Sequence, residues 1–127
     1  MARYKYKLNL IPMNKYFVLF CVPVATMAGW VTTTTPEERK TQSDQMMKDW
    51  MVWMDKLGAK LVDKGMPLGK TKRVTKGKVE DVKNDLNYYV MVEAESHDAA
   101  AALITDSPHF GIPDAYVEVI EIPHMGM

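Results

Sequence analysis

A histidine and two aspartates are the residues best suited to proton transfer. An imidazole exchanges a proton near neutral pH, and His109 follows an expected helix end marked by Pro108. Asp49 and Asp44 lie in a segment with helical spacing, and either could orient His109 across a cleft. Such a pair would suit isomerisation or elimination, with His109 as the base. The simpler interpretation is a surface or loop histidine and two aspartates on a solvated helix face.

The remaining histidines and the single cysteine predict no metal site. His97 falls in the first turn of an expected second helix, where it should be exposed, and His124 follows the last expected strand. Cys21 lies in an apolar run and should be a small buried hydrophobe. Because no Cys-x-x-Cys, His-x-x-x-His, glycine-rich phosphate loop or nucleophile elbow occurs, no cofactor is expected.

Large aromatic side chains offer a different chemistry, the binding of a flat or apolar small molecule. Such rings, together with the 11 methionines, can line a pocket, although most of them should belong to the core. The candidate ligand-binding residues are Trp30, Trp50, Trp53 and Phe110.

Charge argues against a nucleic-acid partner. The chain has 16 basic and 16 acidic side chains, 25% charged and 47% hydrophobic residues, which is typical of a globular protein. Five basic residues nevertheless fall within positions 70–78, where a solvated hairpin is the simple explanation and an anion site or acidic partner the alternative. They are Lys70, Lys72, Arg73, Lys76 and Lys78.

Length and cysteine content predict one domain in a reducing compartment. A chain of 127 residues can form one core, and one cysteine cannot make an internal disulfide, so a cytoplasmic location is expected. Residues 1–12 are interpreted as an extension outside the fold, and 13–127 as the domain. A signal-peptide interpretation of the N-terminus is disfavoured because cleavage would remove the best strand. No apolar stretch is long enough for a membrane span.

The elements that must position these residues alternate between strands and helices. Residues 16–22 form an apolar strand, 24–34 read as a loop around Trp30, and Thr35 with Glu38 makes a capping box that begins a helix ending at Gly58. A short strand at 59–63 follows, and 71–75 and 78–82 flank Gly77 as a hairpin. Residues 88–92 form another two-sided apolar strand, 96–104 a short helix, and 116–122 the last strand.

The order β-α-β, hairpin, β-α-β predicts an α+β domain of ferredoxin-like topology, with an antiparallel sheet and two helices on one face. Two strands are apolar on both sides, so the uncovered face must also be hidden. Pairing of two copies through this face, as a homodimer, is the simplest cover.

Several of these segments together resemble the YCII-related family, which includes proteins with an Asp-Gly-Pro-Phe motif. The resemblance spans residues 14–123 and implies a dimeric α/β barrel. It implies no catalytic residue, because 76–79 keep only the glycine of that motif and the first helix lacks the histidine of other members. The segments that carry the resemblance are 15–20, 35–38, 53–58, 88–96, 107–111 and 117–119.

Three functions are therefore weighed. The dimer could bind a small, partly aromatic molecule between the helices and the sheet. The same cleft could perform acid-base chemistry with His109. The protein could also be an interaction module without a ligand, which would show as a dimer with no cavity.

Overall fold

A four-stranded antiparallel sheet organises the chain, of which the structure, a computed structural model, describes residues 13–124. Its strands are ordered β2-β5-β1-β6, with bounds β1 Asn14–Cys21, β2 Leu61–Asp63, β5 Leu86–Ala94 and β6 Tyr116–Ile122. The predicted extension 1–12 and residues 125–127 lie outside the described part. This order is compatible with the predicted ferredoxin-like α+β fold.

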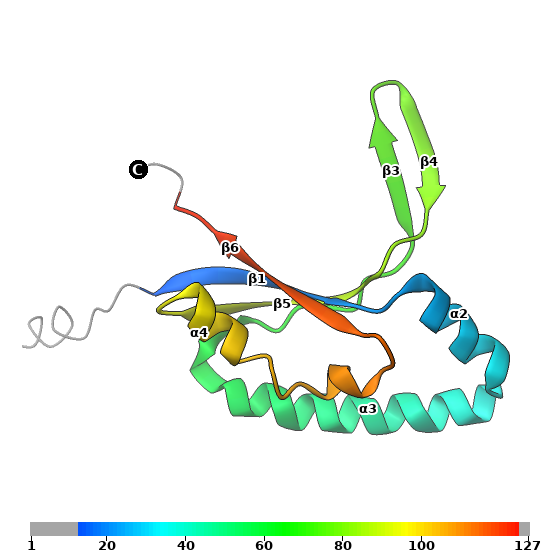
Figure 1. Cartoon of the computed structure of the whole chain (residues 1–127), viewed down its shortest axis with the longest axis horizontal. Coiled ribbons are helices and arrows are strands. Elements are labelled where there is room, and N and C mark those ends of the chain that lie inside the picture. Colours follow the sequence, from blue (N-terminus) through cyan, green and yellow to red (C-terminus); the bar gives the residue numbers. More distant parts are fainter. Residues whose placement is uncertain (1–12, 125–127) are drawn as a thin grey trace, which may run out of the picture.

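The helices lie on one side of the sheet and a hairpin rises on the other (Figure 1). The α-helices are α2 (Val24–Thr33), α3 (Pro36–Leu57) and α4 (His97–Ala102), and the 3₁₀ turns are η1 (Gly58–Lys60) and η2 (Pro108–Gly111). Within the described part, no helix combines the length and apolarity needed to cross a bilayer.

The start of α3 forms as the sequence predicts. Thr35 Oγ1 accepts a hydrogen bond from the Glu38 amide at 3.1 Å, and Glu38 Oε1 accepts one from the Thr35 amide at 2.8 Å. Gly58 ends the helix with φ of +55°. The reciprocal bonds satisfy two amides that the first turn leaves free, so local sequence is enough to set this boundary.

The prediction of a loop over 24–34 is wrong, because this segment contains helix α2. No side chain at its own N-cap accepts a hydrogen bond, and none of its residues is buried. Instead, the Val24 amide donates to Asp85 Oδ1 at 3.2 Å, and Asp85 is 61 residues further along the chain. The start signal therefore comes from a distant loop and could not be seen as a local pattern.

Alternation along β1 separates the two faces of the sheet. Tyr16, Val18 and Phe20 are almost fully buried beneath the helices, together with Val90 and Val92 of β5. The intervening side chains point to the face that no helix covers. The core is thus built between one sheet face and α3 and α4.

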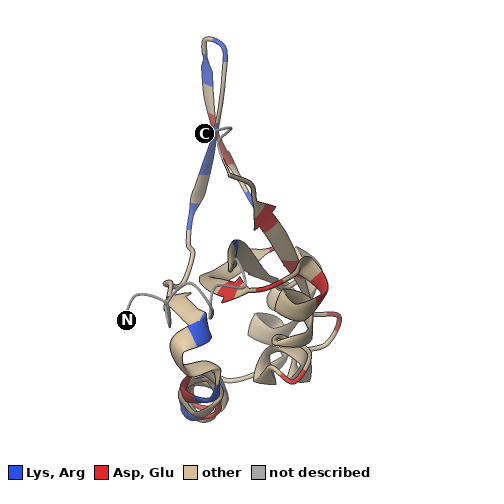
Figure 2. Ribbon diagram, turned by 90° about the vertical axis from the view of Figure 1, so that its left-hand side faces the viewer, with Lys and Arg blue, Asp and Glu red and all other residues tan. Residues whose placement is uncertain are grey.

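The hairpin forms as predicted and stands apart from the main sheet. Strands β3 (Thr71–Thr75) and β4 (Lys78–Val82) pair only with each other, and Gly77 takes φ of +75° at the turn. Figure 2 shows it projecting from the body, with Lys and Arg along it. Two neighbouring predictions need correction: β2 begins at Leu61 because η1 occupies Gly58–Lys60, and α4 ends at Ala102, before residue 104.

Candidate functional site

A cavity of about 760 Å³ lies between α2, α3, β5 and the η2 segment. Small-molecule sites in proteins typically measure about 300 to 1,000 Å³. Aromatic, thioether and small polar side chains dominate the lining, which contains no Asp, Glu, Lys or Arg. The lining residues are Thr26, Met27, Trp30, Thr33, Gln42, Ser43, Met46, Met47, Trp50, Pro67, Asn87, Tyr88, His109, Gly111, Ile112 and Pro113.

Aromatic rings form the inner wall of the cavity. The Trp50 ring centroid lies 5.0 Å from that of Tyr88 and 4.7 Å from that of Phe20, in edge-to-face arrangements. Phe20 is fully buried in the sheet, and the Tyr88 hydroxyl donates to the Lys64 carbonyl at 3.2 Å. Packing of this kind fixes the rings in place before any ligand arrives.

Trp50 carries a buried polar group without a partner. Its side chain is 9% exposed. Among the buried side-chain nitrogen and oxygen atoms of residues 13–124, only Trp50 Nε1 lacks a hydrogen-bond partner. A buried donor without a partner costs about 1 to 3 kcal/mol relative to a satisfied one. The neighbouring indole of Trp30 differs, because its Nε1 donates to Gln42 Oε1 and so joins α2 to α3.

His109 reaches the cavity from η2 and is held by the backbone. Ser107 Oγ accepts from the His109 amide at 3.2 Å, and Pro108 occupies the first position of the turn. The imidazole is 3% exposed, so the interpretation of a surface histidine is wrong. Its Nε2 lies 2.9 Å from the Cys21 carbonyl oxygen and 3.3 Å from that of Tyr116.

These two carbonyls determine which ring nitrogen of His109 carries the proton. A carbonyl oxygen only accepts, so Nε2 must donate, and Nδ1 carries the lone pair of the neutral ring. Burial lowers the pKa of His109 below its ordinary value, while the bonds to Cys21 and Tyr116 oppose that shift. The side chain is therefore neutral at physiological pH and offers an acceptor at Nδ1.

The aspartates predicted to assist His109 are engaged elsewhere. Asp49 is exposed on α3, where its Oδ1 accepts from Gln45 Nε2 at 3.0 Å, and Asp44 pairs with Lys40 at 2.8 Å. Within the described residues, no hydrogen bond joins His109 to a carboxylate. The structure thus places Asp49 and Asp44 on a solvated helix face and leaves the orientation of His109 to backbone carbonyls.

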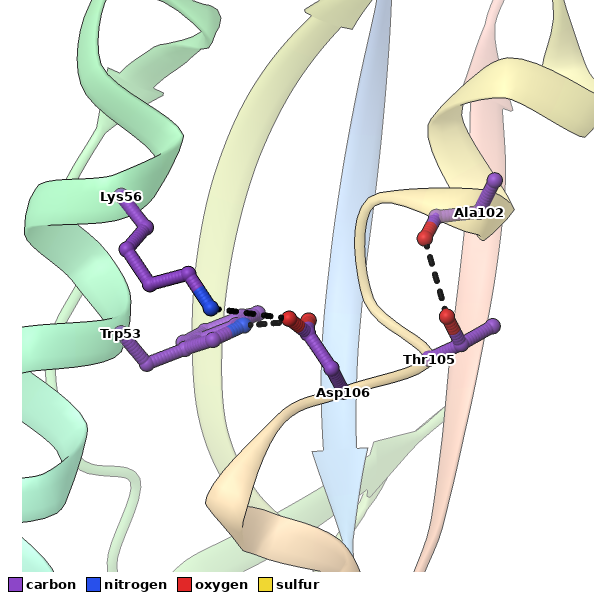
Figure 3. Close-up of polar contacts among 5 residues, drawn as sticks. All are labelled: Trp53, Lys56, Ala102, Thr105 and Asp106. Atoms are coloured by element: carbon purple, nitrogen blue, oxygen red, sulfur yellow. Dashed lines mark hydrogen bonds and ion pairs between the residues drawn. The ribbon is translucent and has the colours of Figure 1, made fainter.

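The four predicted aromatic residues separate into two pairs. Trp30 and Trp50 line the cavity, whereas Trp53 and Phe110 do not. Trp53 is 4% exposed, and its Nε1 donates to Asp106 Oδ1 at 2.9 Å, as Figure 3 shows. Phe110 is 46% exposed, with its ring centroid 6.1 Å from that of His109.

The other candidate residues lie away from the cavity. His97 is exposed as predicted, although its ring stacks on Tyr16 and its Nε2 lies 2.7 Å from the Val119 carbonyl oxygen. His124 is exposed. Cys21 is buried as predicted, and burial raises the pKa of its thiol. In the basic hairpin, Lys72 pairs with Asp81 at 2.6 Å.

A second pocket, of about 510 Å³, lies between α2 and the base of the hairpin. Its lining includes Lys70, Lys83 and Asp85, so it is more polar than the larger cavity, and it contains none of the predicted catalytic or ligand-binding residues.

Sequence reasoning missed several residues of the larger cavity. The sequence predicts Tyr88 only as part of a strand, and Gln42 and Ser43 only as parts of a helix. Alternation along β5 does place Tyr88 on the same face as Val90, which is a signal that was available. No local signal marks Gln42 or Ser43, because their role depends on the position of α2.

No group of three His, Cys, Asp or Glu side chains within residues 13–124 is placed to hold a metal ion.

No family model and no curated protein matches the sequence. Evidence about function therefore comes from the geometry of the chain itself.

Proposed function

We propose that the protein binds a small, flat and largely apolar molecule in the cavity between α2, α3 and β5. The single observation that supports this function is the cavity of about 760 Å³ with Trp30, Trp50 and Tyr88 in its lining. Rings and thioether side chains give such a ligand dispersion contacts, and its burial releases apolar surface from water. An interaction module without a ligand is expected to lack a cavity, so the geometry favours ligand binding.

A cavity-filling substitution tests this function. The probe is N-phenyl-1-naphthylamine, an uncharged dye whose fluorescence rises in apolar surroundings. We expect wild-type protein to bind the dye and Ser43→Trp to weaken binding by at least about tenfold, because the new indole occupies the cavity. Asp44→Trp is the matched control, since Asp44 is the next residue on α3 and does not line the cavity.

Both variants change exposed positions, so their thermal midpoints should stay close to that of the wild type. Failure of the wild type to bind the dye, or equal binding by Ser43→Trp and Asp44→Trp, would contradict ligand binding in this cavity. Native mass spectrometry of protein purified gently from its host would identify a retained ligand.

We further propose that two copies pair through the sheet face that no helix covers, forming the dimeric α/β barrel that the resemblance to the YCII-related family implies. On this face the cross-strand neighbours Phe17 and Met91, Leu19 and Tyr89, and Phe17 and Ile120 are apolar. Ile120 is 43% exposed in the single chain. A twofold pairing would bury the same patch on both copies.

The hairpin supports a second copy as the occupant of this face. It rises on the open side of the sheet (Figure 1), and its paired Val74 and Val79 are 72% and 62% exposed. A lone two-stranded hairpin is marginally stable in water, so contact with a partner would stabilise it. Its basic residues complement the exposed Glu118 of β6, the cross-strand neighbour of Leu19 on this face.

Light scattering coupled to gel filtration tests the dimer. Wild-type protein should elute as a dimer, and Ile120→Glu as a monomer, because a carboxylate in the paired faces would be buried without a partner. Met51→Glu is the matched control, since Met51 is 63% exposed on α3. A monomeric wild type, or a dimeric Ile120→Glu, would overturn this pairing.

Acid-base chemistry at His109 is a second candidate for the cavity, favoured by the acceptor that its neutral tautomer leaves at Nδ1. In this version of the acid-base hypothesis, the base is oriented by the Cys21 and Tyr116 carbonyls and not by an aspartate. The test is hydrogen exchange in D₂O at the methyl group of 2-acetylnaphthalene, followed by NMR. Exchange faster than in buffer and lost in His109→Gln supports catalysis, and an unchanged rate contradicts it.

A further inference from the structure

The pocket at the base of the hairpin combines apolar walls with positive charge. It measures about 510 Å³, which is within the usual range for small-molecule sites. One face of α2 supplies part of the lining, and the base of the hairpin supplies much of the rest. The apolar residues include Val24, Met27 and Val31 on α2 and Leu68, Val82 and Leu86 near the hairpin. Because α2 buries none of its residues, this apolar face of the helix is open to a ligand.

Charged residues within the hairpin ladder face residues of opposite charge. The register places Lys72 opposite Asp81, and their side chains form a salt bridge at 2.6 Å. Arg73 lies opposite Glu80 in the same ladder. Opposite charges at facing positions stabilise a strand pair, and like charges destabilise it. The two basic residues of β3 are therefore balanced by acidic residues of β4.

The base of the hairpin breaks this pattern. The ladder ends at Thr71 and Val82, and the next residue outward on each side is a lysine, Lys70 or Lys83. Both lysines line the pocket, and in the described part of the chain neither forms a salt bridge. Two ammonium groups beside one pocket repel each other, so an anion placed between them would be stabilised by both.

The lining contains one acidic residue, Asp85, whose carboxylate is already bonded within the fold. Its Oδ1 accepts from the Val24 amide at 3.2 Å, and its Oδ2 accepts from the Tyr116 hydroxyl at 2.7 Å. Both oxygens thus hold neighbouring elements together. Two lysines and one carboxylate leave the lining with a net positive charge.

We propose that this pocket binds a small amphipathic anion, with its apolar body against α2 and its anionic group between Lys70 and Lys83. A medium-chain carboxylate is the simplest molecule of this class. Burial of the chain removes apolar surface from water, and the ammonium groups donate charge-assisted hydrogen bonds to the carboxylate. The site is distinct from the larger cavity, whose lining contains no charged side chain and shares only Met27 and Asn87 with this pocket.

Octanoate and 1-octanol test the ligand class, because they share an eight-carbon chain and differ in charge. Affinities would be measured by NMR titration, following the backbone amides of α2 and of the hairpin base. We expect octanoate to bind at least about tenfold more tightly than 1-octanol at low salt, and to lose affinity as salt screens the lysines. Equal binding of the two compounds, or no octanoate binding, would overturn the proposal.

A pair of lysine substitutions assigns the charge preference. Lys83→Met should weaken octanoate binding by at least about fivefold and leave 1-octanol binding unchanged, because it removes one ammonium group and keeps an unbranched chain. Lys76→Met is the matched control, since Lys76 lies in the same hairpin and does not line the pocket. Equal octanoate affinities of the two variants would contradict an anion site at the hairpin base.

Two tryptophan substitutions decide which cavity holds octanoate. Val31→Trp should weaken octanoate binding by about tenfold, because Val31 lines this pocket and is 52% exposed. Ser43→Trp fills the larger cavity and should leave octanoate binding unchanged; loss of binding in this variant would overturn the assignment to the hairpin base. Failure of the dye to bind the larger cavity contradicts the proposed function alone, so the two proposals fail separately.

Discussion

Trp50 and Trp53 lie three residues apart on α3, yet they belong to different kinds of environment. Both are buried, and both rings pack on Phe20, with centroid distances of 4.7 and 6.0 Å. Trp53 donates to Asp106, whereas Trp50 borders the cavity with no partner. The difference lies in what faces the helix. Asp106, in the segment after α4, contacts Trp53, whereas the cavity lies between α2 and Trp50. One helix therefore contributes one tryptophan to the packed core and another to the cavity lining.

The largest expected effect is on stability when each ring is removed. Trp53→Ala should lower the free energy of unfolding by about 3 to 5 kcal/mol, because it opens a void in packed core. Trp50→Ala should cost less, since that ring already borders open space. Denaturant unfolding of the two variants measures the difference. Equal costs would mean that the two halves of α3 are packed alike.

A smaller effect is expected at His109, on the cavity side. His109→Gln should cost about 1 to 3 kcal/mol, because a flexible amide replaces the packed ring whose Nε2 donates to the Cys21 and Tyr116 carbonyls. The folded pKa of His109 is lowered, so below the ordinary value of 6.5 the unfolded state binds the proton first. Stability from this group is complete above pH 6.5 and falls as pH drops toward the folded pKa.

The variant provides the control for that pH dependence, because it retains the other two histidines, His97 and His124. Subtracting the profile of His109→Gln from that of the wild type isolates the contribution of His109. A difference that is flat across this range, or that rises as pH falls, would show that the ring is not held in its neutral form.

Removing the acceptor of Trp53 sharpens the contrast between the two indoles. Asp106→Ala should lower the free energy of unfolding measurably, since the Trp53 N–H loses its partner. Asp106→Asn keeps an acceptor and should cost less. Trp50→Phe loses part of the ring packing but also removes a buried donor that has no partner, so its net cost should stay below that of Asp106→Ala. A larger cost for Trp50→Phe than for Asp106→Ala would reveal a hidden partner of Trp50.

The smallest effect is expected from the ion pair at the same place. Lys56 Nζ lies 3.2 Å from Asp106 Oδ2, with both side chains more than half exposed (Figure 3). Lys56→Met should lower the free energy of unfolding by at most about 0.5 kcal/mol, because solvent and salt screen such a pair. Denaturant midpoints at low and high salt measure it. A loss comparable to that of Asp106→Ala would mean that the pair is shielded from water.

Local signals explain why much of the fold was predictable. The capping box at Thr35, the glycine at 77 and the alternation along β1 each specify structure within a few residues. Helix α2 was not predictable, because its first amide is satisfied by Asp85 from another part of the chain. For the same reason, the sequence does not indicate that α2 forms one wall of the cavity.

The candidate site was predictable only in part. Trp50 and Trp53 share one apolar stripe, so their spacing indicates that both face inward but not which one finds a partner. His109 could be chosen for its chemistry, whereas its burial depends on carbonyls of Cys21 and Tyr116 that only the folded sheet brings together. Pairing it with Asp49 failed because a helix face toward solvent looks the same in sequence as one toward a cleft.

Helix α2 buries none of its own residues and is held by a few hydrogen bonds, among them that of the Trp30 indole to Gln42. Asp85 holds its first amide, and the Arg39 guanidinium donates to the Val31 and Thr34 carbonyls beyond its middle. Such a helix can swing outward without exposing the core, at a free-energy cost far below that of global unfolding. The backbone amides of α2 should therefore exchange with deuterium faster than those of β1 and β5, whose inward side chains form the core.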